Sequence, residues 1–421
     1  MEFKKWRKVL LTGAAALALA ACGSQKTDNK TANKADSGDK TKLVVGVDKI
    51  YSEYMKDIKD KFEKDNKITL EIKEVNQSDV LTNLPTDGPT GSAPDVMMAP
   101  YDRVGGLGQQ GHLAEVKLEN TDQYDDKMKS MVTLDGKVYG QPNVIETLVL
   151  YYNKDLLKEA PKTFEDLEKL QKDPKYAFEG ESGKSTGFLA DWTNFYYSYG
   201  VSAGYGAYVF GKNGTDPKDI GLAAGDSEKA LEYVKKWYDT WPQGMKDASK
   251  SGAFASEQFI GKKAAAIIDG PWKAASFKQA KVNYGATTIP TLPNGKTYSP
   301  FAGGKAWVIS NYSKNKEGAQ KFLAYITGEE AQKKFFDKTQ EVPATKVGRK
   351  YADEKGTDLT KAIVKQFENS QPMPNIPEMA EVWNPGKAMY FDVASGKKDA
   401  KTAIKDAVEA IKSAIEQKFA K

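Results

Sequence analysis

Charged and aromatic side chains directly follow three of the predicted strands. Asp48 and Lys49 follow the first, residues 101–103 (Tyr-Asp-Arg) the second and residues 269–272 (Asp-Gly-Pro-Trp) the third. In open α/β sheets, ligands bind beyond the carboxyl ends of the strands, so we expect these side chains to face one cleft. Carboxylates there could hydrogen-bond a polar ligand or act as a general acid and base. No known catalytic motif joins them.

Aromatic residues crowd the segment 192–210. Eight of its 19 residues are aromatic, against 11% for the whole chain: Trp192, Phe195, Tyr196, Tyr197, Tyr199, Tyr205, Tyr208 and Phe210. Some must be core, since Phe195 and Tyr199 share a helical face. Others could form a platform for a sugar ring, because the partial negative charge of an aromatic face attracts the C–H face of the sugar. Aspartate and arginine nearby would bind the hydroxyl groups, so a carbohydrate suits the pattern without being the only ligand that does.

The single histidine and the single cysteine exclude most other site chemistry. His112 and Cys22 cannot build a Cys/His zinc cluster or a disulfide within the chain, and a catalytic triad would have to use His112. Residues 106–111 match the dinucleotide pattern G-x-G-x-x-G, but no strand directly precedes the first glycine. We therefore expect no cofactor and no metal.

The charge distribution argues against a nucleic-acid partner. The net charge of the 421 residues is +5, of which 4 − 1 = 3 comes from residues 1–21. The remaining charges alternate in sign along the chain, and no basic stripe is present.

The first 22 residues predict export and lipid anchoring. A cationic segment (residues 4–8) precedes about 12 apolar residues, too few to cross a membrane that needs about 20. The following Leu-Ala-Ala-Cys22 resembles a bacterial lipobox, which implies a signal peptide over 1–21, a lipid on Cys22 and a flexible tether to residue 41. An ordinary export signal with an incidental cysteine is the alternative.

Hydrophobic periodicity predicts an α/β fold with at least two lobes. Residues 43–47 form a strand, Tyr51 to Phe62 an amphipathic helix, and residues 68–72 a second strand, parallel to the first. The last helix carries an apolar stripe from Ile404 to Phe419. Further strands are expected at residues 96–99, 148–152, 264–268 and 306–309.

Five motifs together resemble the maltose/maltodextrin-binding proteins of ABC sugar importers, and most closely the lipoproteins of Gram-positive bacteria. The resemblance runs from about Leu43 to near the C-terminus. It rests on Pro-Asp…Tyr-Asp-Arg-Val-Gly-Gly (94–106), Val-Ile-Glu…Tyr-Asn-Lys-Asp-Leu (144–156), Asp-Gly-Pro-Trp (269–272), Lys-Val-Asn-Tyr-Gly (281–285) and Met-Pro-Asn-Ile-Pro-Glu-Met-Ala-Glu-Val-Trp (373–383).

This resemblance implies a two-lobed periplasmic-binding-protein-like fold that closes around sugar by hinge bending. One lobe would comprise residues 42–144 and 303–353, the other 145–302 and 354–421. The implied partners are maltooligosaccharides, a membrane permease and, through Cys22, the outer face of the cell membrane. We expect a monomer.

The resemblance also implies the residues that contact sugar. Hydroxyl groups would be bound by Asp48, Lys49, Asp102, Arg103 and Glu146, and glucose rings would stack on Trp272 and Trp383. Lys387 stands where the best-known family member has an arginine. Ala99 replaces a stacking tryptophan, so Tyr101 is expected to supply part of that surface. Asp191 and Trp192 stand near a sugar-contacting Glu-Pro-Tyr triplet, which suggests an acceptor and a stacking ring.

Two alternatives remain open from the sequence. Asp102 and Glu146 could be the acid/base pair of an extracellular glycosidase. The same fold could also bind a different oligosaccharide or a peptide. Each proposed contact residue could instead be structural: Asp102 and Arg103 an ordinary surface pair, Glu146 a satisfied carboxylate between lobes, and the tryptophans part of the core.

Overall fold

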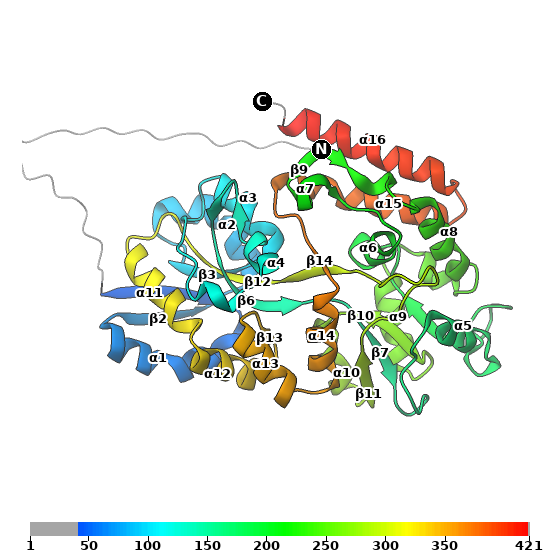
Figure 1. The fold of residues 1–421 in the computed structure, drawn as a ribbon. Helices are drawn as coiled ribbons and strands as arrows, with labels where there is room; N and C mark the ends of the chain where they lie inside the picture. The colour runs from blue at the N-terminus through cyan, green and yellow to red at the C-terminus, as the bar shows by residue number, and fades with distance from the viewer. Residues whose placement is uncertain (1–40, 420–421) are drawn as a thin grey trace, which may run out of the picture. The chain divides into compact units, whose positions relative to one another are not determined.

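The computed structural model describes residues 41–419, which form the predicted α/β fold (Figure 1). The predicted signal peptide and Cys22 lie outside the described residues. The largest sheet has seven strands in the order β13-β6-β12-β3-β1-β2, with β14 beside β12. They are β1 (Lys42–Val47), β2 (Thr69–Glu74), β3 (Val96–Pro100), β6 (Gln141–Glu146), β12 (Phe301–Ile309), β13 (Val342–Pro343) and β14 (Gln371–Pro372).

A second sheet has four strands in the order β11-β7-β10-β8. They are β7 (Val149–Asn153), β8 (Phe188–Ala190), β10 (Ala266–Asp269) and β11 (Tyr284–Thr287). The short strands β4 (Thr133–Leu134) and β5 (Lys137–Val138) pair with each other, and β9 is Asp216–Ile220. All seven strands of the first sheet come from residues 42–146 and 301–372. The division into one lobe of residues 42–144 and 303–353 and another of residues 145–302 and 354–421 remains a prediction.

The strand–helix–strand unit at the start of the fold is confirmed. β1 and β2 pair in parallel, with Leu43 opposite Leu70. The helix between them buries Tyr54, Ile58 and Phe62 completely, as its apolar spacing predicts. Tyr51 precedes this helix, in the 3-10 turn η1 (Lys49–Tyr51), and is also buried.

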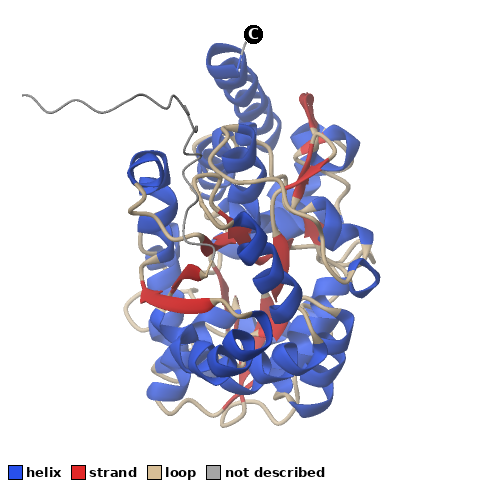
Figure 2. Cartoon of the chain, turned by 90° about the vertical axis from the view of Figure 1, so that its left-hand side faces the viewer, coloured by secondary structure: helices blue, strands red, loops and turns tan. Residues whose placement is uncertain are grey.

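Helices cover the outside of both sheets, and the strands lie inside (Figure 2). Figure 1 shows α1 and α12 on one face of the seven-stranded sheet and α2 and α3 on the other. The helices are α1 (Ser52–Asn66), α2 (Gln77–Thr90), α3 (Tyr101–Gln109), α4 (Asp126–Ser130), α5 (Phe164–Lys172), α6 (Phe195–Gly204), α7 (Gly211–Gly214), α8 (Ser227–Tyr238), α9 (Ser251–Ile260), α10 (Ala274–Gln279), α11 (Lys316–Ile326), α12 (Glu329–Thr339), α13 (Lys346–Lys355), α14 (Asp358–Glu368), α15 (Trp383–Ala394) and α16 (Ala400–Phe419). Among residues 41–419, no helix is both long and apolar enough to cross a membrane.

Candidate functional site

The first polar group of the candidate site lies where β3 becomes α3. Pro100 ends the strand, and Asp102 lies in the first turn of the helix, where backbone N–H groups favour a negative charge. Burial raises the pKa of Asp102, and the positive charge of Arg103 opposes this shift. Asp102 is half-buried and Arg103 exposed. Asp102 is hydrogen-bonded only by its own backbone N–H, and among residues 41–419 no hydrogen bond or ion pair joins either side chain to another residue. Both are therefore free to bind a ligand.

Asp102 and Arg103 line a cavity of about 340 Å³ together with Trp383. The other side of the cavity comes from the 3-10 turn η7 (Pro377–Glu381) and the start of α15, where Trp383 is the first residue. The structure thus brings Trp383 to the neighbouring residues Asp102 and Arg103, although it lies 280 positions after Arg103 in the chain. A carboxylate, a guanidinium and an indole around one hollow can bind hydroxyl groups and an apolar ring face simultaneously.

A continuous row of rings joins Trp383 to Trp272, and we call it the aromatic strip. Ring centroids lie 5.9 Å apart from Trp383 to Phe301, 5.9 Å from Phe301 to Tyr196, and 6.0 Å from Tyr196 to Trp272. Within the strip, Trp272 is 45% exposed, whereas Phe301 is fully buried. Burial raises the pKa of Tyr196, and the negative charges of Glu146 and Asp102 raise it further, so both carboxylates lie near the strip.

Glu146 belongs to a second set of side chains, which we call the carboxylate–lysine cluster. Glu146 ends β6, and its Oε1 accepts a hydrogen bond of 2.9 Å from Lys305 Nζ. Lys305 Nζ also lies 2.7 Å from Glu341 Oε1, and Glu341 Oε2 accepts a hydrogen bond of 2.7 Å from the Tyr51 hydroxyl. Glu146 Oε2 has no partner in the described part of the chain and can accept a hydrogen bond from a ligand.

Asp48 and Lys49 lie on the turn that carries Tyr51. Asp48 Oδ1 accepts a hydrogen bond of 3.0 Å from the backbone N–H of Gln77, so one carboxylate oxygen anchors the start of α2. Lys49 is exposed. Because Tyr51 is tied to the carboxylate–lysine cluster, the cluster holds this turn in place.

Asp191 and Lys387 approach each other from different segments. Asp191 Oδ1 accepts hydrogen bonds from Ser251 Oγ at 2.5 Å and Thr193 Oγ1 at 3.1 Å. Burial raises the pKa of Asp191, and these two hydrogen bonds and the charge of Lys387 oppose the shift. Lys387 is half-buried one helical turn after Trp383, so it lies on the same side of α15 as that ring.

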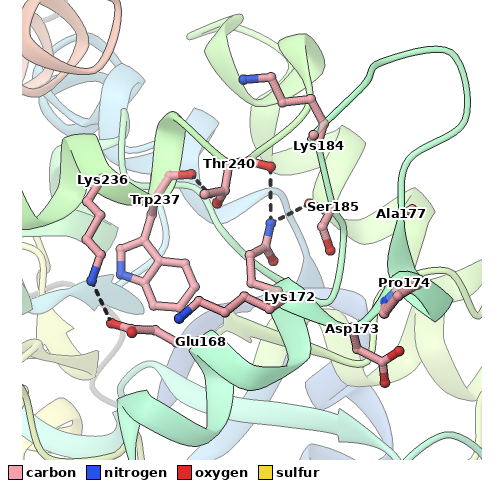
Figure 3. A pocket seen from close by; sticks show the side chains of 12 residues that line it. Glu168, Lys172, Asp173, Pro174, Ala177, Lys184, Ser185, Lys236, Trp237 and Thr240 are labelled. Atoms are coloured by element: carbon pink, nitrogen blue, oxygen red, sulfur yellow. Dashed lines mark hydrogen bonds and ion pairs between the residues drawn. The ribbon is translucent and has the colours of Figure 1, made fainter.

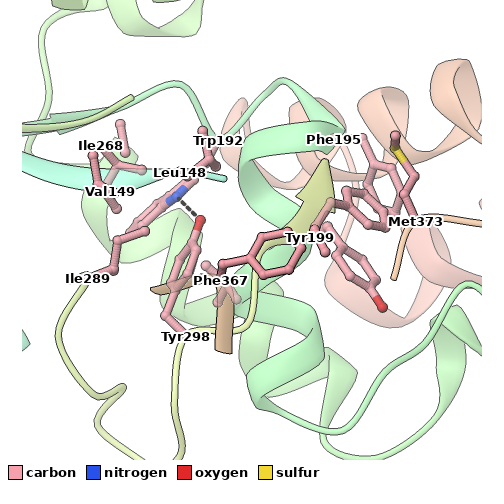
Figure 4. Packing of buried hydrophobic residues seen from close by; sticks show 14 of the residues in the cluster. Leu148, Val149, Trp192, Phe195, Tyr199, Ile268, Ile289, Tyr298, Phe367 and Met373 are labelled. Carbon is pink, nitrogen blue, oxygen red and sulfur yellow. Dashed lines mark hydrogen bonds between the residues drawn. The ribbon is translucent and has the colours of Figure 1, made fainter. Parts of the chain in front are cut away.

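Trp192 and Tyr101 correct the sequence-based expectation, because both are 0% exposed. The Trp192 ring packs among Phe188, Trp237 and Trp241. Its Nε1 donates to the Tyr298 hydroxyl at 3.3 Å, as Figure 4 shows. The Tyr101 hydroxyl donates to the backbone oxygen of Val144 at 2.8 Å. Neither ring has a face left for a sugar, so both stabilise the fold and are dropped from the candidate site.

Sequence reasoning missed Tyr196, Phe301, Lys305 and Glu341. The aromatic-rich segment was a signal for Tyr196, but its rings could not be divided between core and surface without the helix boundary at Asn194, whose side chain caps α6. Lys305 and Glu341 belong to no motif. Only the strand pairing brings them next to Glu146.

A second cavity, of about 360 Å³, lies between α5, the segment 183–185 and α8 (Figure 3). None of the predicted site residues lines it. Its polar groups are largely paired with one another: Lys236 Nζ with Glu168 at 3.1 Å, and Gln171 Nε2 with the backbone oxygens of Ser185 and Thr240. This cavity therefore presents fewer free polar groups to a ligand than the cavity at Asp102.

Asp269 makes stability depend on pH. Burial raises its pKa to about 6, although the Tyr197 hydroxyl and the Gly270 N–H each donate to Oδ1 at 2.8 Å. The folded state therefore favours the protonated form. This contribution is complete below about pH 4, the unfolded pKa, and is lost as the pH rises through about 6.

Asp269→Asn is expected to raise the thermal midpoint at about pH 7 by a few degrees and to leave it unchanged near pH 4. The asparagine keeps an acceptor oxygen but cannot ionise. Thermal unfolding followed by circular dichroism at both pH values is the measurement. Asp126→Asn is the matched control, because the Asp126 side chain is fully exposed. It should leave the thermal midpoint unchanged at both pH values. Equal midpoints for Asp269→Asn and the unchanged protein at both pH values would contradict the prediction.

Within residues 41–419, no group of three or more His, Cys, Asp and Glu side chains is arranged to hold a metal ion. The polar groups of the site are hydrogen-bond donors and acceptors beside aromatic rings. Such an arrangement can bind a neutral, hydroxyl-rich molecule that has apolar ring faces.

Residues 57–358 match the family described as bacterial extracellular solute-binding protein. The chain is 55% identical over 419 residues to a maltodextrin-binding protein of Bacillus subtilis (strain 168), covering 99% of both chains. It is 54% identical over 422 residues to a maltooligosaccharide ABC transporter solute-binding lipoprotein of Streptococcus pneumoniae, covering 100% of this chain and 99% of the relative. A maltose-binding periplasmic protein of Listeria monocytogenes, solved with maltose, superposes with a TM-score of 0.89 at 54% identity, covering 91% of this chain and 100% of that one.

Proposed function

The chain belongs to the bacterial extracellular solute-binding proteins, and on that basis we propose that it captures maltodextrins outside the cell and delivers them to the permease of an ABC importer. The observation that carries this proposal is the aromatic strip, which runs from Trp272 to Trp383 near the carboxylates of Asp102 and Glu146. Ring faces at the two ends of the strip and carboxylate oxygens beside it suit a chain of α-1,4-linked glucose. The relatives are binding proteins, not enzymes, so the glycosidase alternative is set aside.

In the proposed complex, glucose rings stack on Trp272 and Trp383. Asp102, Arg103 and Glu146 bind the hydroxyl groups of the sugar. Asp48 and Lys49 contribute from the turn after β1, and Asp191 and Lys387 from the other side of the cleft. The lobes at residues 42–144 with 303–353, and 145–302 with 354–421, close about the hinge. Closure is favoured only with sugar present, because the sugar contacts both lobes.

Calorimetric titration of residues 23–421 with maltotriose tests this function. We expect saturable binding of intact maltotriose and none of lactose, with glucose as a second control. Binding of another oligosaccharide in place of maltotriose would keep the family and change the ligand. Shortened sugars in the calorimeter cell after the titration would instead indicate hydrolysis and would contradict the binding-protein assignment.

We also propose that the protein is held at the outer face of the cell membrane by a lipid on Cys22, as a monomer. The lipobox-like sequence before Cys22 supports this, and the Streptococcus pneumoniae relative is named a lipoprotein. Cys22→Ala is expected to abolish lipidation and release the protein into the medium. Phase partition in detergent measures this, with Ser24→Ala as the matched control that keeps the anchor. Continued partition of Cys22→Ala into the detergent phase would contradict the proposal.

A further inference from the structure

The carboxylate–lysine cluster is built by four segments that are far apart in sequence. Gly303 on β12 pairs with Glu146 on β6, and Lys305 is two residues further along β12, so its side chain is the diagonal neighbour of Glu146. The pairing of β6 with β12 shifts register directly after Lys305. Gly304 has φ +131, and a Cβ there would meet the backbone oxygen of Val144 at 1.9 Å. Only glycine therefore allows β12 to place Lys305 in this position.

The cluster carries two negative charges and one positive charge away from bulk water. The side chains of Lys305, Glu146 and Glu341 are 18%, 20% and 19% exposed. Burial lowers the pKa of Lys305, but the charges of Glu146 and Glu341 outweigh it, and the pKa is raised well above its usual value. The other titratable groups whose pKa is raised by these carboxylates are tyrosine hydroxyls. Tyr51 faces Glu341, and Tyr101 and Tyr196 lie near Glu146. Among residues 41–419, Lys305 is therefore the only cation in contact with the pair.

The two carboxylates are not equivalent. Both oxygens of Glu341 are occupied, one by Lys305 and the other by the Tyr51 hydroxyl. Glu146 gives only Oε1 to Lys305, and its other oxygen has no partner among residues 41–419; the carboxylate as a whole lies near Tyr196 of the aromatic strip. Lys305 thus fixes Glu146 through one oxygen and leaves the second for a ligand.

We propose that Lys305 is a positioning residue for sugar binding: through its hydrogen bond to Oε1 it holds Glu146 in place beside the cleft, although the like charge of Glu341 lies close by. This inference rests on the proposed function and adds a residue to it. Without the cation, two carboxylates in a poorly solvated site repel each other, and one takes up a proton at a raised pKa. Near neutral pH the shared proton lets them stay together, and at higher pH Glu146 is driven away from its position.

Lys305→Gln is the direct test, because glutamine keeps hydrogen-bond donors and loses the charge. We expect the maltotriose affinity of this variant to fall about tenfold or more between about pH 5.5 and 8.5, because the like charges of Glu146 and Glu341 repel each other increasingly as the pH rises. The unchanged protein should show little change over that range. Lys305→Arg keeps the charge and should restore the flat profile. Calorimetry at each pH is the measurement, and circular dichroism checks the fold.

The double variant Lys305→Gln/Glu341→Gln is the matched control, because it lacks both the cation and the competing carboxylate. Its affinity should again be independent of pH. If Lys305→Gln is too unstable to titrate, thermal unfolding provides the same comparison: this variant should be more stable at the lower pH, and the double variant should not. A flat profile for Lys305→Gln, or a steep one for the double variant, would overturn the inference. Absence of maltotriose binding by the unchanged protein would instead refute the proposed function.

Discussion

Replacing Trp272 with alanine is expected to weaken maltotriose binding by about 1–3 kcal/mol, the range found for aromatic stacking on nucleobases. Trp272 ends the aromatic strip and is 45% exposed, so one ring face is open to a sugar. Because the side chain is not part of the core, the free energy of unfolding should change by less than about 0.5 kcal/mol. Calorimetric titration gives the affinity, and thermal unfolding gives the stability.

Tyr208→Ala is the matched control, since Tyr208 is another exposed aromatic residue, at 36%, and lies outside the aromatic strip. Its loss should leave maltotriose affinity unchanged. Gly270→Ala is a second way to disturb Trp272 without deleting it, because a Cβ at Gly270 would meet the indole ring at 2.1 Å. It should weaken binding in the same direction. Equal affinities for Trp272→Ala, Gly270→Ala and the unchanged protein would refute stacking on Trp272.

The sequence predicted the strand ends of the site well, because the position of a side chain after a strand follows from local pattern. Asp102 is the second residue after an apolar run that forms β3, and Trp272 is the third residue after an apolar run that forms β10. The cavity at Asp102 also contains Trp383, which only the family resemblance could connect to it.

The cluster around Lys305 could not be predicted from local pattern. Its contact with Glu146 depends on the pairing of β6 with β12, two strands 159 residues apart at the contact, and on a register shift beside Gly304. Periodicity shows that each strand exists but not which strands pair, nor where a bulge lies. The carboxylate–lysine cluster therefore depends on the tertiary fold and not on any local sequence pattern.

The error at Trp192 has a different cause. An aromatic residue before a helix has the same sequence signature whether it faces a cleft or the core. Trp192 lies two residues before Asn194, which caps α6. Its ring packs against Phe164 of α5 and Trp237 of α8. The family resemblance suggested Trp192 as a stacking ring because it stands near a sugar-contacting triplet, although its neighbours are supplied by helices before and after it in the chain.

Trp192→Ala is accordingly expected to lower the free energy of unfolding by about 3–5 kcal/mol, the usual cost of removing a large buried aromatic side chain. The ring packs 5.4 Å from Trp241 and 6.2 Å from Trp237, and its loss leaves a cavity between α5 and α8. It also leaves the Tyr298 hydroxyl without the Nε1 donor. Chemical denaturation measures the change.

The decisive comparison is between stability and affinity in the same molecules. Trp192→Phe keeps most of the packing and loses only the Nε1 donor and part of the ring, so its destabilisation should be smaller than that of alanine. Both variants should bind maltotriose with nearly unchanged affinity once the folded fraction is taken into account, because no face of Trp192 reaches the cleft. Trp272→Ala should show the opposite behaviour, with weaker maltotriose binding and nearly unchanged stability. A loss of affinity in Trp192→Phe without a loss of stability would mean that Trp192 contacts the ligand. That result would contradict its assignment to the core.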